Sequence, residues 1–362
     1  MFRNGLEPLK NRTLESCAVN NAPPDQTVSD VGEHVLIRRI QNRVDDSFPS
    51  VILGIGDDAA VIEPKRGTVS VITTDTLVEG VHFDRLWTPM NAIGHKTLAV
   101  SLSDLAAMGA TPSHALLSLA LPATTLTREV DDLVDGLLSL ANRYKTALVG
   151  GNITEAREEL HVEVTAMGHV KRRKLLRRTG AKPGDNIYVT GEIGSAAAGL
   201  ASLRISQTDD SSDTGTRDCQ HRYLCPEPRV RLGNQLGKNQ AARSCIDLSD
   251  GLADGVRQLA EADCLGARID AKSIPLSSGA RHWFESCGLD PVIAAITGGD
   301  DYELLFTASP NMKRRVETVT KLSGKLPVTC IGTMTKDPST VLIRNGKEEM
   351  LPDGYQHLRT KP

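Results

Sequence analysis

The stretch GIGDDAAVIEP, residues 54–64, follows the apolar run VIL and decides which fold the first half of the chain can adopt. It contains the Gly-x-Gly-x-x-Ala pattern of a dinucleotide-binding turn. Such a turn needs a helix directly after the glycines, whose N–H groups face a pyrophosphate. Here Asp57 and Asp58 would place two negative charges at that position, and Pro64 ends the segment after a strand's length. The stretch therefore indicates a strand, a tight turn and a second strand, and it argues against a dinucleotide site.

Composition narrows the class of protein. A chain of 362 residues is long enough for two domains. Its net charge of −3 and its aromatic content of 3% argue against a nucleic-acid partner. The seven cysteines contain no Cys-x-x-Cys pair, which favours reduced thiols in a cytoplasm. No run approaches the roughly 18 apolar residues of a membrane span, so we expect a cytoplasmic protein without a membrane partner.

Patterned segments alternate between helix and strand along two halves of similar size, which predicts an α/β (α+β) fold. We expect a disordered extension over residues 1–28, a first domain over residues 29–170 and a second over residues 171–362. Helices are predicted behind Ser29, over residues 92–110 and behind Thr127, which we expect to cap its helix. A polar segment at residues 206–218 is expected to be a loop.

Acidic residues recur at the ends of apolar strands or within small-residue turns. Grouped carboxylates on apolar elements repel each other and are poorly solvated unless a cation holds them. Oxygen-rich sites without thiolates suit Mg²⁺, and phosphate chemistry is the usual purpose of such sites. A single Asp of this kind is often only a turn former or helix cap, so the prediction depends on their repetition. The residues are Asp57, Asp58, Asp75, Asp104, Asp247, Asp250, Asp300 and Asp301.

Other motifs have plain structural readings beside functional ones. The glycines of VGGNIT, residues 149–154, fit either a strand exit or a close approach to phosphate. His82 is more typical of a packed or capping histidine than of a ligand. The basic run KRRKLLRR, residues 171–178, favours a solvated strand or loop with at most one arginine reaching a phosphate. Tyr355 would by default anchor the C-terminal tail.

An ordered set of short motifs resembles the thiamine-monophosphate kinase family of the aminoimidazole-ribonucleotide (AIR) synthetase-like superfamily. The set spans about residues 31–358 and consists of GIGDDAAV, TTDTLVEGVHF, SLSDLAAMGA, LVGGN, RTGAKPGDNIYVTG, IDLSDGL and GGDDYELLF. The resemblance implies a two-domain fold, with an N-terminal β-rich dimerisation domain and a C-terminal α/β domain, in a homodimer. It also implies transfer of the γ-phosphoryl group of ATP to thiamine monophosphate, assisted by several Mg²⁺ ions.

The same resemblance implies roles for particular residues. Asp75 and Asp104 would be catalytic. The metal ligands would be Asp57, Thr73, Thr74, Asp75, Asp104, Asn152, Asp247 and Asp250. The ATP contacts would be Gly151, Asn152, Arg178 and Ser249. The contacts to thiamine monophosphate would be His82, Asp300 and Tyr355.

This chain departs from the family pattern at two of these positions. Asn152 stands where many members have Asp, and Asp300 stands where Glu is usual. These departures leave open a catalytically silent nucleotide-binding protein. Another ATP-using member of the superfamily, of the selenophosphate or aminoimidazole ribonucleotide synthetase type, is a second alternative. Residues 1–50 lack the cysteine or selenocysteine next to a lysine in a glycine-rich loop that a selenophosphate synthetase would be expected to show.

Overall fold

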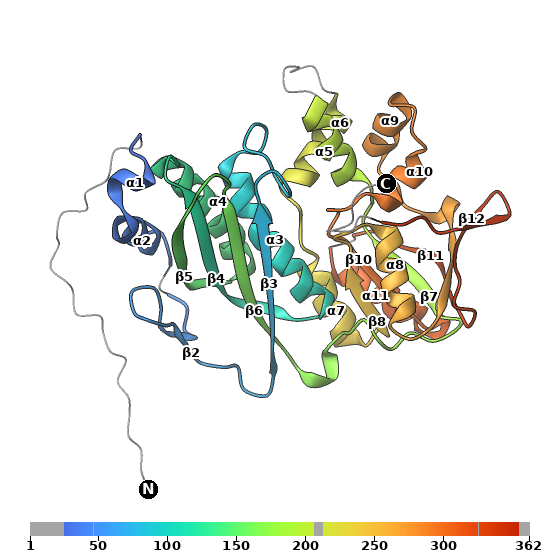
Figure 1. The fold of residues 1–362 in the computed structure, drawn as a ribbon. Helices are drawn as coiled ribbons and strands as arrows, with labels where there is room; N and C mark the ends of the chain where they lie inside the picture. Colours follow the sequence, from blue (N-terminus) through green and yellow to red (C-terminus); the bar gives the residue numbers. More distant parts are fainter. Residues whose placement is uncertain (1–24, 46, 206–212, 325, 355–362) are drawn as a thin grey trace, which may run out of the picture.

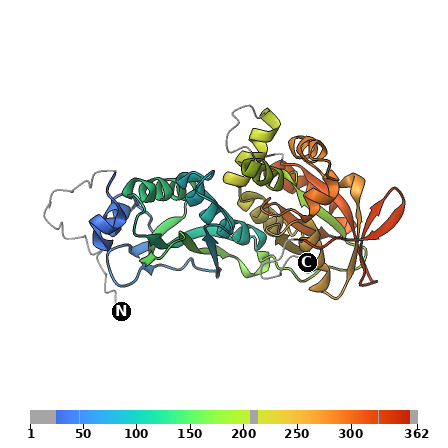
Figure 2. The same cartoon turned by 45° about the horizontal axis from the view of Figure 1, so that its top comes forward.

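The computed structural model describes residues 25–45, 47–205, 213–324 and 326–354. Its strands form two large sheets and one small one (Figure 1). The four-stranded sheet comes from residues 69–170 and the seven-stranded sheet from residues 186–350. Figure 2 shows the two sheets side by side along the molecule, each with its own helices.

The four-stranded sheet has the order β3-β6-β4-β5. β4 and β5 are parallel, and the other neighbours are antiparallel. Helices α3 and α4 cover one face of the sheet (Figure 2). Along β6 buried and half-buried side chains alternate, because successive side chains point to opposite faces. The bounds are β3 Val69–Val78, β4 Thr111–Pro122, β5 Ala147–Ala156, β6 His161–Val170, α3 Met90–Ala107 and α4 Thr127–Tyr144.

Helix α3 is buried on almost every side, because it lies between α4, the four-stranded sheet and elements of the second sheet. Its sequence is mostly apolar and has no continuous polar face, as expected for a helix without a solvent face. The close approach of α4 requires glycine at Gly94, where an added Cβ would lie 1.8 Å from the Leu133 carbonyl oxygen. Polar residues within α3 therefore meet protein groups rather than bulk water.

The first described elements are two short helices and a two-stranded sheet. The single helix predicted behind Ser29 is wrong: α1 (Val28–Val31) and α2 (Glu33–Gln41) are separated by Gly32 at φ 76°. α1 thus begins one residue before the predicted domain start at residue 29. Residues 1–24 of the predicted extension lie outside the described residues. β1 (Val51–Leu53) pairs with β2 (Val61–Ile62), so a strand follows the GIGDD turn, as predicted.

The seven-stranded sheet is mixed, with the order β13-β12-β9-β11-β7-β10-β8. The strands are β7 Asn186–Thr190, β8 Ser244–Asp247, β9 Gly266–Asp270, β10 Leu304–Ala308, β11 Val328–Thr335, β12 Thr340–Arg344 and β13 Lys347–Met350. The helices around it are α5 Ser195–Ile205, α6 Thr214–Leu224, α7 Val230–Asn239, α8 Leu252–Glu261, α9 Ser278–Ser286, α10 Pro291–Thr297 and α11 Lys313–Leu322. Short 3₁₀ turns are η1 Arg172–Lys174, η2 Ala271–Ser273 and η3 Pro310–Met312.

Two predictions about local structure are corrected. The predicted polar loop ends early, because α6 begins at Thr214, capped by Asp213, whose side chain accepts a hydrogen bond from the Thr216 N–H. Thr127 is the first residue of α4 rather than its cap, which is Leu126. Within the described residues, no helix has both the length and the apolar character needed to cross a bilayer.

Candidate functional site

Two carboxylates meet where β3 packs on α3. Ser101 Oγ donates a hydrogen bond to Asp75 Oδ2 at 2.7 Å, and Thr73 Oγ1 donates one to Asp104 Oδ2. Asp75 and Thr73 are two residues apart on a strand, so both side chains point to the helix-covered face. The structure thus brings the two predicted catalytic residues together with Thr73.

A third carboxylate reaches the same helix from the second sheet. Asp247, the last residue of β8, is buried and accepts a hydrogen bond from Ser103 Oγ at 2.7 Å. Ser103 and Asp104 are consecutive in α3. α3 therefore joins carboxylates from both sheets, and we call Asp75, Asp104 and Asp247 the acidic cluster.

The carboxylates of the acidic cluster are costly to ionise. Burial and then the charge of Asp104 raise the pKa of Asp75 to about 6. Burial, with the charges of Asp104 and Asp75, raises the pKa of Asp247 to about 7. Burial also raises the pKa of Asp104, although the Thr73 hydrogen bond and the charge of Arg178 oppose that shift. Buried carboxylates that repel one another at neutral pH form a place where a cation is stabilised.

The donor set fits Mg²⁺ in type. The acidic cluster offers carboxylate and hydroxyl oxygens. Among the described residues, no three His, Cys, Asp or Glu side chains are arranged to hold one ion by themselves. Mg²⁺ is usually held by one or two carboxylates, with water and substrate phosphate completing its shell. The cluster therefore fits ions shared with a phosphate substrate better than a closed structural metal site.

The turn after β8 contacts the loop before β10. The Asp300 N–H donates to the Ser249 carbonyl at 2.7 Å, and the Tyr302 N–H donates to the Leu248 carbonyl at 3.0 Å. Gly299 permits this approach, because an added Cβ would lie 2.4 Å from the Ser249 carbonyl oxygen. The predicted metal and nucleotide residues of the turn, Ser249 and Asp250, therefore lie beside the predicted substrate residue Asp300.

Asp300 and Asp301 have different roles. Asp300 Oδ2 accepts a hydrogen bond from Lys96 Nζ at 3.1 Å, and its Oδ1 accepts one from the Tyr302 hydroxyl at 3.0 Å. Asp301 is partly buried and accepts hydrogen bonds from the N–H groups of Gly194 and Ala196 at the start of α5. Asp301 is thus the helix-capping aspartate that the plain structural reading describes.

His82 has the capping geometry that its sequence context favours. Its Nδ1 accepts a hydrogen bond from the Val78 N–H at 3.1 Å, and its carbonyl oxygen accepts one from the Tyr223 hydroxyl at 2.9 Å. These bonds fix the loop after β3. Tyr355, the third predicted contact to substrate, lies outside the described residues.

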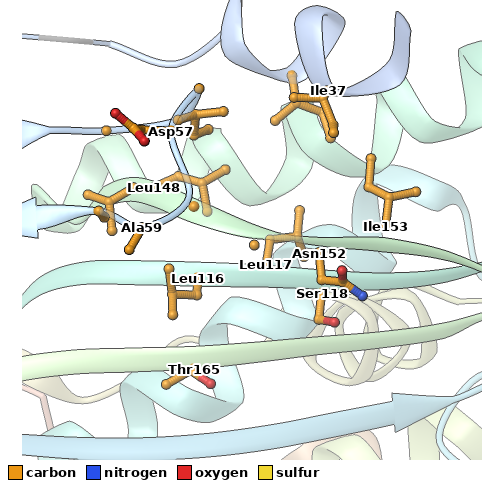
Figure 3. Close-up of a pocket in the computed structure, with 18 of the residues that line it drawn as sticks. Ile37, Asp57, Ala59, Leu116, Leu117, Ser118, Leu148, Asn152, Ile153 and Thr165 are labelled. Carbon is orange, nitrogen blue, oxygen red and sulfur yellow. The ribbon is translucent and has the colours of Figure 1, made fainter. Parts of the chain in front are cut away.

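A second group of predicted residues lines a pocket of about 990 Å³ on the other face of the four-stranded sheet. Figure 3 shows Asp57 and Asn152 at this pocket, together with Thr165. Thr74 belongs to the same face, because its hydroxyl lies 3.1 Å from the Thr165 hydroxyl. The hydroxyls of Thr73 and Thr74 therefore point to opposite faces of the sheet, and within one chain only that of Thr73 lies at the acidic cluster.

Gly151 and Arg178 are the remaining predicted contacts to ATP. Gly151 is required by strand pairing, because an added Cβ would lie 1.8 Å from the Leu117 carbonyl oxygen of β4. Arg178, at the end of the basic run, is exposed and donates to Gln258 Oε1 at 2.8 Å. Its charge reaches Asp104. Arg178 therefore lies on the second half of the chain, with its guanidinium bonded to α8 and its charge lowering the pKa of Asp104.

Sequence reasoning missed three residues of α3 that hold the site: Lys96, Ser101 and Ser103. The signal for Lys96 was present. It is the only Lys, Arg, Asp or Glu in residues 92–103, and a lysine inside an apolar helix usually has a buried partner.

Comparison with known proteins shows the family to which the chain belongs. Family models for the AIR synthase related protein match at residues 56–170 (N-terminal domain) and 182–345 (C-terminal domain). The chain is 41% identical to the thiamine-monophosphate kinase of Escherichia coli (strain K12) over 337 residues, 91% of this chain and 99% of that protein. The chain belongs to the thiamine-monophosphate kinase family. This result confirms the predicted family and fold class.

Solved structures of the family have the same fold. The thiamine-monophosphate kinase of Stenotrophomonas maltophilia K279a is 36% identical, with a TM-score of 0.76 over 86% of this chain and 95% of that chain. The AaThiL complex with AMPPCP and TMP is 31% identical, with a TM-score of 0.72 over 92% of this chain and 99% of that chain. That relative therefore holds an ATP analogue and TMP together.

Proposed function

We propose that this protein transfers the γ-phosphoryl group of ATP to thiamine monophosphate, giving thiamine diphosphate and ADP, the last step of thiamine diphosphate biosynthesis. The observation that carries the proposal is the acidic cluster, in which α3 joins Asp75 and Asp104 to Asp247. Membership of the family supports the choice of substrates, since the AaThiL structure contains AMPPCP and TMP.

Several Mg²⁺ ions would be held by oxygen ligands on both faces of the four-stranded sheet and in the turn after β8. Bound Mg²⁺ neutralises the charge on a transferring phosphoryl group. The acidic cluster and Thr73 lie on one face of the sheet, and Asp57, Thr74 and Asn152 on the other. At Asn152 an amide oxygen replaces the carboxylate of many relatives, so that position contributes a neutral ligand.

The transfer would be a direct in-line displacement. An oxygen of the acceptor phosphate attacks the γ-phosphorus of ATP, the bond to the β–γ bridging oxygen breaks, and ADP leaves. The acceptor oxygen is already anionic at neutral pH, so the reaction needs positioning and charge stabilisation rather than a strong general base. Arg178, Gly151, Asn152 and Ser249 would hold the ATP phosphates, and His82, Asp300 and Tyr355 would hold thiamine monophosphate.

A homodimer would complete the first domain, residues 29–170, beside a second domain of residues 171–362. Among the described residues, the face of β3 that points away from α3 is exposed: Ile72 is 63% exposed, and Thr74 and Thr76 lie exposed beside it. The same face of a second copy would cover these side chains and bring the pocket with Asp57 and Asn152 to the interface. Dimerisation is tested by Ile72→Asp, which should give a monomer in light scattering. If the variant stayed dimeric, the proposal that this face forms the dimer interface would be refuted.

The proposed activity is tested by incubating the protein with ATP, Mg²⁺ and thiamine monophosphate in a buffer of neutral pH and separating the products. We expect thiamine diphosphate and ADP in equal amounts. Asp104→Asn should form no detectable product. Asp132→Asn, the same change at an exposed position of α4, should retain activity. Nucleotide binding without thiamine diphosphate formation would favour the catalytically silent alternative, and full activity of Asp104→Asn would refute the role of the acidic cluster.

A further inference from the structure

A buried lysine joins two parts of the chain that the proposed function assigns to substrate. We call Lys96, Tyr223, Asp300 and Tyr302 the Lys96 cluster. The Lys96 side chain is 2% exposed, its Nζ lies 3.1 Å from Asp300 Oδ2, and it lies 3.7 Å from the centre of the Tyr223 ring. A buried ammonium group is costly unless a carboxylate and an aromatic face replace its water shell. The cluster supplies both.

Hydrogen bonds hold both oxygens of the Asp300 carboxylate, while the side chain stays partly exposed. Lys96 bonds Oδ2, and the Tyr302 hydroxyl bonds Oδ1 at 3.0 Å. The backbone is held in the left-handed region at both Asp300 (φ 69°) and Tyr302 (φ 49°), a conformation that persists only where surrounding contacts enforce it. The Asp300 side chain is nevertheless 31% exposed. Because each carboxylate oxygen can accept more than one hydrogen bond, Asp300 can still accept one from a ligand.

The other side of Lys96 leads to His82. The Tyr223 ring lies against the ammonium group, and its hydroxyl donates to the His82 carbonyl oxygen at 2.9 Å. Burial and the charge of Asp300 raise the pKa of Tyr223, so its hydroxyl keeps the proton that it donates. One side chain of α3 thus sets the separation between the loop of His82 and the loop of Asp300.

We propose that Lys96 and Tyr223 are positioning residues that orient Asp300 and His82 for the thiamine moiety of the substrate and thereby set affinity for thiamine monophosphate. This inference rests on the proposed function, which assigns His82 and Asp300 to that substrate. Neither positioning residue touches the transferring phosphoryl group, which the acidic cluster serves. Loss of either should weaken substrate binding and leave the phosphoryl-transfer step almost unchanged.

A neighbouring ion pair shows what a purely structural contact looks like. Glu303 is 1% exposed, and Arg229 Nε donates to its Oε2 at 2.7 Å. That pair has no accessible carboxylate oxygen to offer a ligand. The accessible carboxylate of Asp300 is therefore the feature that separates the Lys96 cluster from a simple clamp between α3 and β10.

The test measures KM for each substrate, kcat, and the Kd of thiamine monophosphate by calorimetry without ATP. Lys96→Met keeps most of the side-chain volume and removes the charge. We expect KM and Kd for thiamine monophosphate to rise about tenfold or more, with KM for ATP and kcat within about twofold. Tyr223→Phe removes one oxygen atom and keeps the ring over Lys96, and we expect about a threefold rise. Tyr223→Phe keeps the proposal testable if Lys96→Met does not fold.

Two controls separate positioning from stability. Tyr144→Phe removes another partly buried tyrosine hydroxyl, which lies within hydrogen-bond distance of Glu227 Oε1 and of the Pro228 carbonyl oxygen, and should leave both KM values unchanged. The double variant Lys96→Met with Asp300→Asn should weaken binding of thiamine monophosphate by less than the product of the two single effects, because Lys96 acts partly through Asp300. Unchanged KM and Kd for thiamine monophosphate in Lys96→Met and Tyr223→Phe, or equal rises of KM for both substrates, would overturn the inference.

The binding measurement distinguishes this inference from the proposed function. If the natural protein binds thiamine monophosphate but forms no product, the proposed reaction fails and the Kd series still decides the role of Lys96. If it forms product and the variants leave Kd unchanged, only the positioning role fails. If it binds no thiamine monophosphate, both are refuted.

Discussion

Replacing Asp75 by asparagine tests the cost of ionising the acidic cluster. The amide keeps an oxygen that can accept the hydrogen bond from Ser101 Oγ, so the packing between β3 and α3 is preserved. What changes is the charge. The variant should therefore be more stable than the natural protein above the pKa of Asp75, and inactive in phosphoryl transfer.

The size of the effect follows from the raised pKa. Burial and the charge of Asp104 raise the pKa of Asp75 from 3.8 to about 6. A difference of about 2 pH units corresponds to about 3 kcal/mol at about 1.4 kcal/mol per unit. Because the folded state binds this proton more tightly than the unfolded state, the free energy of unfolding falls as pH rises from about 4 to about 6. Asp75→Asn removes this fall in the free energy of unfolding, because the amide does not ionise.

The assay is thermal unfolding in EDTA at pH 4 and pH 8. We expect equal midpoints near pH 4 and a midpoint about 4 °C higher for Asp75→Asn at pH 8, since an unfolding entropy of about 2.1 cal/mol/K per residue makes 1 kcal/mol worth about 1.3 °C in a chain of 362 residues. Added Mg²⁺ at pH 8 should stabilise the natural protein more than the variant. A variant less stable than the natural protein at pH 8, or stabilised equally by Mg²⁺, would refute the reasoning.

Three further changes probe other parts of the molecule. Glu303→Gln leaves a buried arginine without its charge partner and should lower the free energy of unfolding by about 3–5 kcal/mol in urea titration, and a loss below about 1 kcal/mol would contradict this. Gly94→Ala places a Cβ 1.8 Å from a backbone carbonyl of α4 and should cost about 3 kcal/mol in the same titration, whereas an unchanged midpoint would show that the helices can separate. Arg178→Ala should raise KM for ATP about tenfold, with Arg173→Ala as the matched exposed control, and equal KM values for the two variants would exclude Arg178 from the nucleotide site.

Periodic apolar residues predicted the elements whose cores are continuous. In α4 the buried residues Val130, Leu133, Leu137 and Leu140 follow helical spacing, and this helix was predicted from that pattern. α6 was missed because its buried residues, Thr216, Cys219 and Tyr223, are few and only partly apolar. Its helical spacing is visible only after its packing partners, α5 and α9, are known.

Part of the candidate site could likewise be predicted from the sequence and part could not. The repetition of carboxylates on apolar elements predicted that Asp75, Asp104 and Asp247 serve one kind of chemistry, because grouped charges need a common cation; only Asp247 ends a strand, whereas Asp75 lies within β3 and Asp104 within α3. Their meeting on α3 depends on how two sheets pack around one helix, and no local pattern contains that information. Lys96 was missed because a lysine in a helix is most often solvated, and its partner Asp300 lies 204 residues away.

The burial of α3 has a consequence for how the protein tolerates change. Lys96, Ser101, Ser103 and Asp104 each contact a different partner on strands and loops from both halves of the chain. A shift of α3 by one residue would rotate these side chains by about 100° and remove all four contacts together. An insertion or deletion of one residue within α3, between Lys96 and Ser101, is thus far more damaging than most single substitutions on the surface of α4.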